Sequence, residues 1–272
     1  MITEELMSSG AKLYKCETWE DFTTQVRKNR FASSSIYRGH SDPSWRLMSL
    51  WERRLETLKP GGDRSKSVHE LMKPELVVST RDNYLEQFKY YAVGLPDFRS
   101  DNLSENDWWA LGRHYGLKTP LLDWSASPYI AAFFAFTGAI DPNSNLDIGS
   151  ISFHPRKYIA IWALACEVFI FKKNEFELVH PSVDRAYRQK AQRGTFSLLT
   201  HDVYMDVESY LASNQHAVYL EKYEIPTKEG FKALRDLSLM NITYATLFPD
   251  LEGAVKQANF KDVTINLRIT NH

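Results

Sequence analysis

The chain has 272 residues, and its 33 lysines and arginines almost balance its 34 aspartates and glutamates, which leaves a formal net charge of −1. This balance argues against a strong overall attraction to nucleic acid or to an anionic membrane. The two cysteines, Cys16 and Cys166, form neither a disulfide framework nor a metal-site spacing, so we expect a protein of the reducing cytoplasm. We find no run of about twenty apolar residues and no signal peptide, so we expect no membrane partner.

The first third of the chain predicts a strand, a loop and a long helix. Residues 36–39 predict a short strand that ends at a glycine. A Pro-Gly-Gly sequence at the centre of residues 59–67 predicts a loop, because proline and glycine disfavour regular structure. Helical spacing of apolar residues then extends over residues 68–92.

A capped helix is predicted next. Ser104 and Asp107 have the spacing of a capping box, and apolar residues then recur at helical intervals up to Tyr115. Gly116 is typical of the position just after a helix, which places His114 in the last helical turn.

A second helix is predicted shortly afterwards. Ser127 followed by Pro128 is typical of an N-cap and a first helical position. Residues 129–137 are apolar on every side, so we expect a buried helix that ends at Gly138.

The segment between these helices, residues 113–125, is rich in groups that can bind a ligand. It contains a histidine, an aspartate, a serine, two aromatic residues and a glycine bend. A segment that only joined two helices would be more polar. We therefore interpret it as a loop that builds a pocket and is held by the helix on either side.

Short strands dominate from residue 149 onward, with helices predicted at residues 183–193 and 228–240. Helices first and strands later favour an α+β fold, with a helical N-terminal half and a β-rich C-terminal half. The strands are predicted at residues 150–153, 158–162, 167–171, 195–199 and 217–225.

Three blocks of sequence carry a family resemblance. The first is Tyr-Arg-Gly at residues 37–39, and the second is residues 114–125 together with the apolar helix that follows. The third contains Arg185 and residues 192–196, and a Leu-Phe-Pro-Asp-Leu run at residues 247–251 also fits. Together these blocks resemble the FRG domain family.

The resemblance covers about residues 30–258 and implies one FRG-type domain over residues 1–272. The sequence departs from the family at Pro120, where a basic residue is expected in a Thr-Arg-Leu-Leu-Asp-Trp run. This chain therefore lacks whatever that side chain contributes. The family is widespread in bacteria and phages, and membership implies a fold more directly than an activity.

The block order is also similar, more distantly, to that of ADP-ribosyltransferases. Those enzymes begin with a Tyr-Arg-Gly strand and continue with a Ser-Thr-Ser strand and a helix rich in alanine and phenylalanine, to which residues 123–135 are similar. The similarity implies an ADP-ribosyltransferase-like core that uses NAD, either hydrolysing it or transferring ADP-ribose to a protein or nucleic acid. A bacterial or phage toxin or defence effector is the setting it implies.

The candidate catalytic residues on this reading are Arg38, His114, Asp123 and Gln192. NAD cleavage passes through an oxocarbenium-like state, as other glycosyl transfers do. Arg38 would bind the diphosphate in a bidentate fork, and His114 would hydrogen-bond a ribose hydroxyl or act as a base. Asp123 would orient Arg38 or stabilise the developing positive charge. A structural alternative for His114 is a hydrogen bond to a carbonyl in the last helical turn.

The candidate nucleotide-binding residues are Arg38, Tyr115, Ser125 and Arg185. Tyr115 would stack on the nicotinamide or adenine ring, and Ser125 would contact ribose. Each residue also has a structural alternative. These alternatives are pairing of Arg38 with Asp123, a core position for Tyr115, a helix cap for Ser125 and a solvated helix face for Arg185.

A glutamine stands where ADP-ribosyltransferases carry a glutamate. Gln192 can position a hydroxyl but offers no negative charge to an oxocarbenium ion. Either Asp123 or a later acid such as Glu221 or Glu224 supplies that charge, or the protein only binds its ligand.

The alternative function is a non-catalytic module that binds a nucleotide or nucleic acid. Residues 184–193 carry four cations around a tyrosine, a pattern that can follow a phosphate backbone. Asp184 and Arg188 stand four positions apart, so one of these cations is expected to be paired within the helix. The eight histidines lack His-x-x-x-His spacing, so we expect no metal cofactor.

Overall fold

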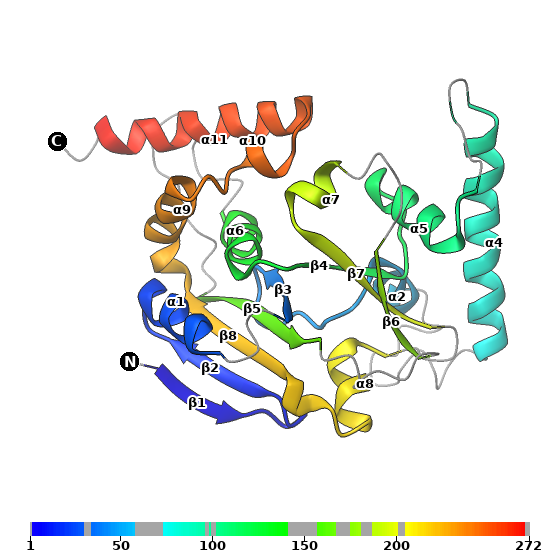
Figure 1. Cartoon of the computed structure of the whole chain (residues 1–272), viewed down its shortest axis with the longest axis horizontal. Helices are drawn as coiled ribbons and strands as arrows, with labels where there is room; N and C mark the ends of the chain where they lie inside the picture. The colour runs from blue at the N-terminus through cyan, green and yellow to red at the C-terminus, as the bar shows by residue number, and fades with distance from the viewer. Residues whose placement is uncertain are drawn as a thin grey trace.

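The computed structural model describes residues 2–29, 34–57, 73–95, 98, 102–140, 157–166, 175–180, 187–200 and 205–269. Within them, eight strands form one mixed sheet, in which all pairs but the second are antiparallel (Figure 1). Across the sheet the strands are β1 (Ile2–Leu6), β2 (Lys12–Cys16), β8 (Leu220–Pro226), β5 (Tyr158–Ala165), β3 (Ser35–His40), β4 (Leu121–Ser125), β7 (Gly194–Leu199) and β6 (Phe176–Val179).

Helices lie on both faces of this sheet. Two short 3-10 turns, η3 (Ala217–Tyr219) and η4 (Thr227–Glu229), flank β8. Among the described residues, no helix is both long and apolar enough to span a bilayer. The helices are α1 (Trp19–Lys28), α2 (Leu50–Thr57), α4 (Pro74–Val93), α5 (Glu105–His114), α6 (Pro128–Gly138), α7 (Tyr187–Ala191), α8 (Val207–Ser213), α9 (Gly230–Leu239), α10 (Tyr244–Leu247) and α11 (Leu251–Ile269).

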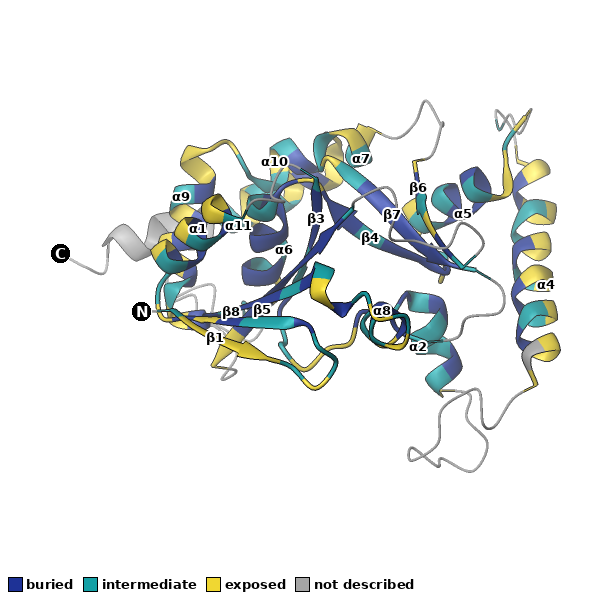
Figure 2. Cartoon of the chain, turned by 60° about the horizontal axis from the view of Figure 1, so that its bottom comes forward, coloured by how far each residue is buried: buried dark blue, intermediate teal, exposed yellow. Residues whose placement is uncertain are grey.

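Separate apolar clusters fill the space between the sheet and its helices. On one face Phe22 of α1, Phe133 of α6 and Leu237 of α9 belong to one buried cluster. On the other face Leu211 of α8 packs with Trp162 of β5. Figure 2 shows the central strands buried, as expected for strands covered on both faces.

A third cluster lies where α5 covers the β4–β7 end of the sheet. Trp109 of α5 packs there with Leu121 of β4 and Phe196 of β7, and Leu85 joins it from α4. Helix α4 lies outside α5 and leaves one of its sides exposed (Figure 2).

The two helices predicted around residues 113–125 are confirmed as α5 and α6. Ser104 and Asp107 form the expected capping box. Gly116 has a φ of +90°, and the N–H of Leu117 donates to the Gly112 carbonyl over 2.8 Å, which is the geometry of a Schellman C-cap.

Helix α6 starts as its sequence predicts. The Ser127 side chain accepts a hydrogen bond from the N–H of Ile130, and Pro128 is the first helical residue. Most of its apolar side chains are buried.

The segment between the two helices is not entirely a loop, contrary to our expectation. Its last five residues form β4, which pairs with β7 from Leu121 opposite Leu198 to Ser125 opposite Gly194. The paired residues lie 69 to 77 positions apart in sequence, so no local pattern indicates the pairing. The candidate residues Asp123 and Ser125 are therefore held by a strand.

The expected division into a helical first half and a β-rich second half is also wrong. Strands β1–β4 all precede residue 126, and helices α7–α11 follow residue 186. The strands of the second half insert between those of the first, because β8 and β5 separate β2 from β3. The fold is nevertheless a mixture of helices and antiparallel-rich sheet, in agreement with the α+β expectation.

Other predicted elements have mixed outcomes. The strands predicted at residues 36–39, 158–162 and 195–199 lie within β3, β5 and β7. The strand predicted at residues 217–225 begins with the turn η3, and the helix predicted at residues 228–240 is α9 after the turn η4.

Some predicted segments fall partly or wholly outside the described residues. The helix predicted at residues 68–92 is described from Pro74 as α4, and the one at residues 183–193 is described as α7. The loop at residues 59–67 and the strands at residues 150–153 and 167–171 lie outside the described residues.

Gly39, the glycine of the Tyr-Arg-Gly block, is required by close packing between β3 and α6. A Cβ atom at this position would lie 1.9 Å from the carbonyl oxygen of Ala131 and 2.9 Å from the backbone nitrogen of Ala135. Any side chain would therefore push α6 away from the sheet. The glycine fixes the position of β3, which carries Arg38.

Candidate functional site

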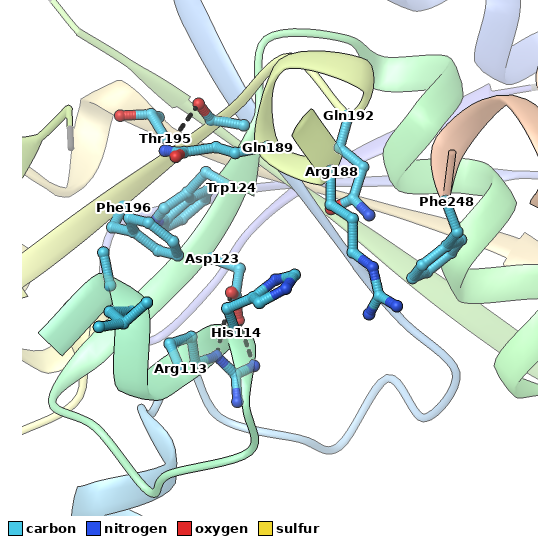
Figure 3. Close-up of a pocket in the computed structure, with 13 residues that line it drawn as sticks. Arg113, His114, Asp123, Trp124, Arg188, Gln189, Gln192, Thr195, Phe196 and Phe248 are labelled. Carbon is cyan, nitrogen blue, oxygen red and sulfur yellow. Dashed lines mark hydrogen bonds and ion pairs between the residues drawn. The ribbon is translucent and has the colours of Figure 1, made fainter. Parts of the chain in front are cut away.

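One pocket of about 290 Å³ brings together several of the candidate residues (Figure 3). Its walls come from α5, β4, α7 and β7 and from Phe248, which follows α10. The lining residues are Ala110, Leu111, Arg113, His114, Asp123, Trp124, Arg188, Gln189, Gln192, Gly194, Thr195, Phe196 and Phe248. The pocket thus joins segments from both halves of the sequence.

His114 is the last residue of α5 and presents its ring to this pocket (Figure 3). Its imidazole makes an edge-to-face contact with Tyr115 at 4.9 Å and no hydrogen bond to any described residue. Burial, followed by the charge of Arg188, lowers its pKa below the ordinary 6.5, although Asp250 and Glu252 oppose the shift. The ring is therefore neutral near pH 7, with one nitrogen able to donate and one able to accept.

Asp123 lies on the floor of the pocket and is held by two arginines. Arg113 donates from Nε to Oδ1 over 3.1 Å and from Nη2 to Oδ2 over 2.5 Å. Arg38 lies on the other side, with Nη1 3.6 Å from Oδ2. Burial alone would raise the pKa of Asp123, but the charge and hydrogen bonds of Arg113, together with Arg38, bring it below its ordinary value. The carboxylate is therefore ionised, and its side chain stays 40% exposed.

Arg38 bridges two strands and does not line the pocket. Its Nη1 donates to the Asp123 carbonyl over 2.7 Å, and its Nε donates to Nε2 of His40 over 3.0 Å. Strands β3 and β4 pair only at Tyr37 and Ser125, so this side chain spans the point where the two strands separate. Burial lowers the pKa of Arg38 to about 10, which leaves the guanidinium charged.

Ser125 and Gln192 connect β4 to the turn after α7. The Ser125 hydroxyl donates to the Gln192 carbonyl over 2.7 Å and accepts from the N–H of Ser127 over 3.1 Å. The Gln192 amide donates to the Leu247 carbonyl over 3.1 Å, although its side chain also lines the pocket. Ser125 is buried and does not line the pocket.

The remaining candidates lie apart from the pocket floor. Tyr115 is 69% exposed, so it is not a core residue, and it does not line the pocket. Arg185 lies outside the described residues. Neither alternative acid lines this pocket. Glu221 accepts hydrogen bonds from Asn29 and Tyr223, and Glu224 forms an ion pair with Lys222.

Three residues that shape the pocket are not among the candidates predicted from the sequence. Arg113 begins the segment already singled out, and its spacing from Asp123 gave no signal because the two residues meet only when β4 turns back beside α5. Arg188 is predicted to pair with Asp184 in a basic helix, but Asp184 lies outside the described residues, and the observed partners of Arg188 are acids more than sixty positions away. Phe248 belongs to the block at residues 247–251, which carried no assigned role.

A comparison with protein families identifies the part of the chain that contains most of these residues. Residues 33–144 match the model of the FRG domain. Over these residues the chain is similar to the FRG domain family. Comparison with curated proteins and with solved structures gives no match.

The matched FRG segment runs from β3 to the end of α6 and thus covers less than half of the chain. It includes Arg38, His114, Tyr115, Asp123 and Ser125. The blocks at residues 185–196 and 247–251, which extended the resemblance, lie beyond it. The FRG segment therefore supplies the floor of the pocket, and the later part of the chain supplies the opposite wall.

Proposed function

We propose that this protein binds NAD or a related nucleotide in the pocket between α5, β4 and α7. The observation that carries the proposal is the arrangement of its lining, in which His114, Asp123 and Gln192 converge with the rings of Phe196 and Phe248. Polar groups that converge in a partly apolar cavity are typical of small-molecule sites.

The size and chemistry of the pocket support a nucleotide. Its volume of about 290 Å³ is near the lower end of ligand pockets, which suits a nucleoside monophosphate or one half of a dinucleotide. An aromatic lining suits a base, because the side chains of Phe196 and Phe248 both contribute apolar surface to the pocket. Neutral His114 and the ionised Asp123 can accept hydrogen bonds from ribose hydroxyls.

The reaction that we propose for this site is cleavage of NAD, with transfer of ADP-ribose to a macromolecule or to water. The bond between ribose C1′ and the nicotinamide nitrogen breaks, nicotinamide leaves with the electron pair, and the acceptor oxygen or nitrogen bonds to C1′. Asp123 is the only acid among the described lining residues, so it is the group that would stabilise the positive charge at C1′. His114 would take the proton of the acceptor.

One observation favours the alternative of binding without catalysis. Arg113 occupies both oxygens of Asp123, so much of the negative charge of this carboxylate is already compensated. A site with no further acid would hold the nucleotide but would stabilise an oxocarbenium ion weakly. The experiment below distinguishes the two functions.

The test is to incubate the protein with adenine-labelled NAD in the presence of cell lysate, total RNA or total DNA. Transfer predicts label on one class of macromolecule, and hydrolysis predicts free ADP-ribose. Both are lost in Asp123→Ala and His114→Ala. Lys190→Gln is the control, because Lys190 is an exposed residue of α7 that does not line the pocket. Binding without turnover predicts that NAD raises the melting temperature of the wild type but not of His114→Ala. If the wild type shows no turnover and NAD does not shift its melting temperature, the proposal is wrong.

A further inference from the structure

A second arginine, Arg188 of α7, lies opposite His114 on the wall of the pocket (Figure 3). Its Nε donates to Oδ2 of Asp250, and its Nη2 donates to Oε2 of Glu252 over 2.6 Å. Its guanidinium carbon also lies 5.3 Å from the centre of the Phe248 ring. One side chain of the wall thus contacts three residues of the C-terminal segment.

The Nη1 nitrogen of Arg188 donates no hydrogen bond to any residue that the structure describes. A guanidinium has five N–H donors in a planar fork that matches phosphate oxygens. Since Arg188 lines the pocket, part of this fork is already available to a ligand there.

Each of the two carboxylates that hold Arg188 also has a second partner. Asp250 also accepts a hydrogen bond from the N–H of Gly253 over 3.0 Å, at the start of α11. Glu252 also pairs with Lys256 over 2.7 Å. Both acids therefore keep a partner when the guanidinium turns toward a ligand, so no carboxylate is left uncompensated.

The exposure of these ion pairs makes the exchange easy. The carboxylate side chains of Asp250 and Glu252 are 34% and 51% exposed, and exposed ion pairs add little to stability. A phosphate offers a denser negative charge and a bidentate geometry. A phosphate can therefore compete with the two carboxylates for the guanidinium.

We propose that Arg188 is the residue by which this pocket selects a phosphate-bearing ligand, and that Asp250 and Glu252 hold its guanidinium until such a ligand enters. The inference rests on the proposed nucleotide function and adds the group that is recognised. It assigns the phosphate to the wall formed by the C-terminal part of the chain, outside the matched FRG segment.

The first experiment measures the affinity of the full chain for AMP and for adenosine by calorimetry. Arg188→Gln is expected to weaken AMP binding by about tenfold or more, because it removes a charged donor, and to leave adenosine binding within about twofold. Lys190→Gln is the matched control, because Lys190 is an exposed cation on the same helix, α7, and does not line the pocket. Equal losses for AMP and adenosine, or no loss in Arg188→Gln, would overturn the proposal.

The second experiment removes the carboxylates. Asp250→Asn with Glu252→Gln is expected to raise AMP affinity several-fold, since the phosphate no longer competes for the guanidinium. Asparagine retains the oxygen that caps α11, so the fold is preserved. The gain should disappear when Arg188→Gln is added. A gain of the same size without Arg188 would show general charge repulsion and would contradict the exchange.

A third probe separates this proposal from the proposed function. If the wild type binds none of NAD, AMP and adenosine, the nucleotide function is wrong. Inorganic pyrophosphate then tests Arg188 alone, with circular dichroism to verify folding. Binding that Arg188→Gln abolishes would support the anion site, and no binding, or equal binding by both proteins, would overturn it.

Discussion

Two arginine–carboxylate clusters face each other across the pocket, and they differ in how they are held. On the floor, Asp123 belongs to a central strand and is contacted by Arg113 from α5 and by Arg38 from β3. On the opposite wall, Arg188 contacts two exposed acids from the segment that begins α11. Both clusters combine arginine with carboxylates, two arginines on one aspartate in the floor and one arginine on an aspartate and a glutamate in the wall.

The surroundings of an arginine, rather than the residue type alone, therefore separate a structural arginine from one that can bind a ligand. Arg38 is 16% exposed and spans two strands, so its movement would disturb the sheet. Arg188 lies on a five-residue helix at the surface, and its partners keep other contacts. We therefore assign the floor to fixing geometry and the wall to recognising the ligand.

The largest expected effect on stability comes from the glycine that positions the floor. Gly39→Ala places a Cβ against the backbone of α6, so we expect it to lower the free energy of unfolding by about 3 kcal/mol. Urea denaturation measures this. Gly116→Ala, where the added Cβ meets no atom within 4 Å and only the positive φ opposes it, should cost about 1 kcal/mol. Equal losses at both positions would contradict close packing as the reason for Gly39.

Removing the floor carboxylate should have the next largest effect. Asp123→Ala leaves Arg113 and Arg38 without their shared partner, and we expect a loss of about 2 kcal/mol in urea denaturation, reduced from that of a fully buried pair because Asp123 is partly exposed. A loss of unfolding free energy below about 0.5 kcal/mol would show that Asp123 contributes no more than an exposed ion pair, and would contradict a structural role for the floor.

The floor also predicts a dependence of stability on pH. Because the pKa of Asp123 is lower in the folded state than the ordinary 3.8, its contribution is complete above that value and is lost as the pH falls through the folded pKa. The difference in unfolding free energy between the wild type and Asp123→Asn should therefore shrink between pH 6 and pH 3. A difference that stays constant over this range would contradict the assigned charge state.

The wall should contribute least to stability. Asp250→Asn combined with Glu252→Gln is expected to leave the unfolding midpoint at pH 7 unchanged within error, because asparagine keeps the oxygen that caps α11 and Glu252 is half exposed. A clear fall in the midpoint would show that the wall is structural, like the floor, and would remove the distinction between them.

Local signals explain what the sequence analysis predicted correctly. The caps at Ser104, Gly116 and Ser127 lie within a few residues of the helix ends that they set, so α5 and α6 could be placed from the sequence. Strand β4 could not, because its pairing with β7 joins residues far apart in the chain. Asp123 at the centre of β4 was recognised as a candidate site residue, but the strand conformation of this segment was not predicted.

The candidate site, like the fold, was predictable only where its residues lie close together in the sequence. His114 and Asp123 were found because one segment carries them both. The roles given to Arg38 and Ser125 differ from their surroundings in the fold, where each connects backbone elements. The pairing of Arg188 with Asp250 depends on how α7 meets α11, and no spacing in the sequence encodes that contact.

The most direct test of the central claim is a structure of the protein determined with NAD. The account predicts NAD in the pocket, with a ribose hydroxyl within hydrogen-bond distance of His114 or Asp123 and a phosphate oxygen on Arg188. It also predicts that Asp123 remains paired with Arg113 while Asp250 and Glu252 no longer contact Arg188. NAD bound elsewhere, or a phosphate placed on Arg113 with Arg188 still held by both acids, would contradict it.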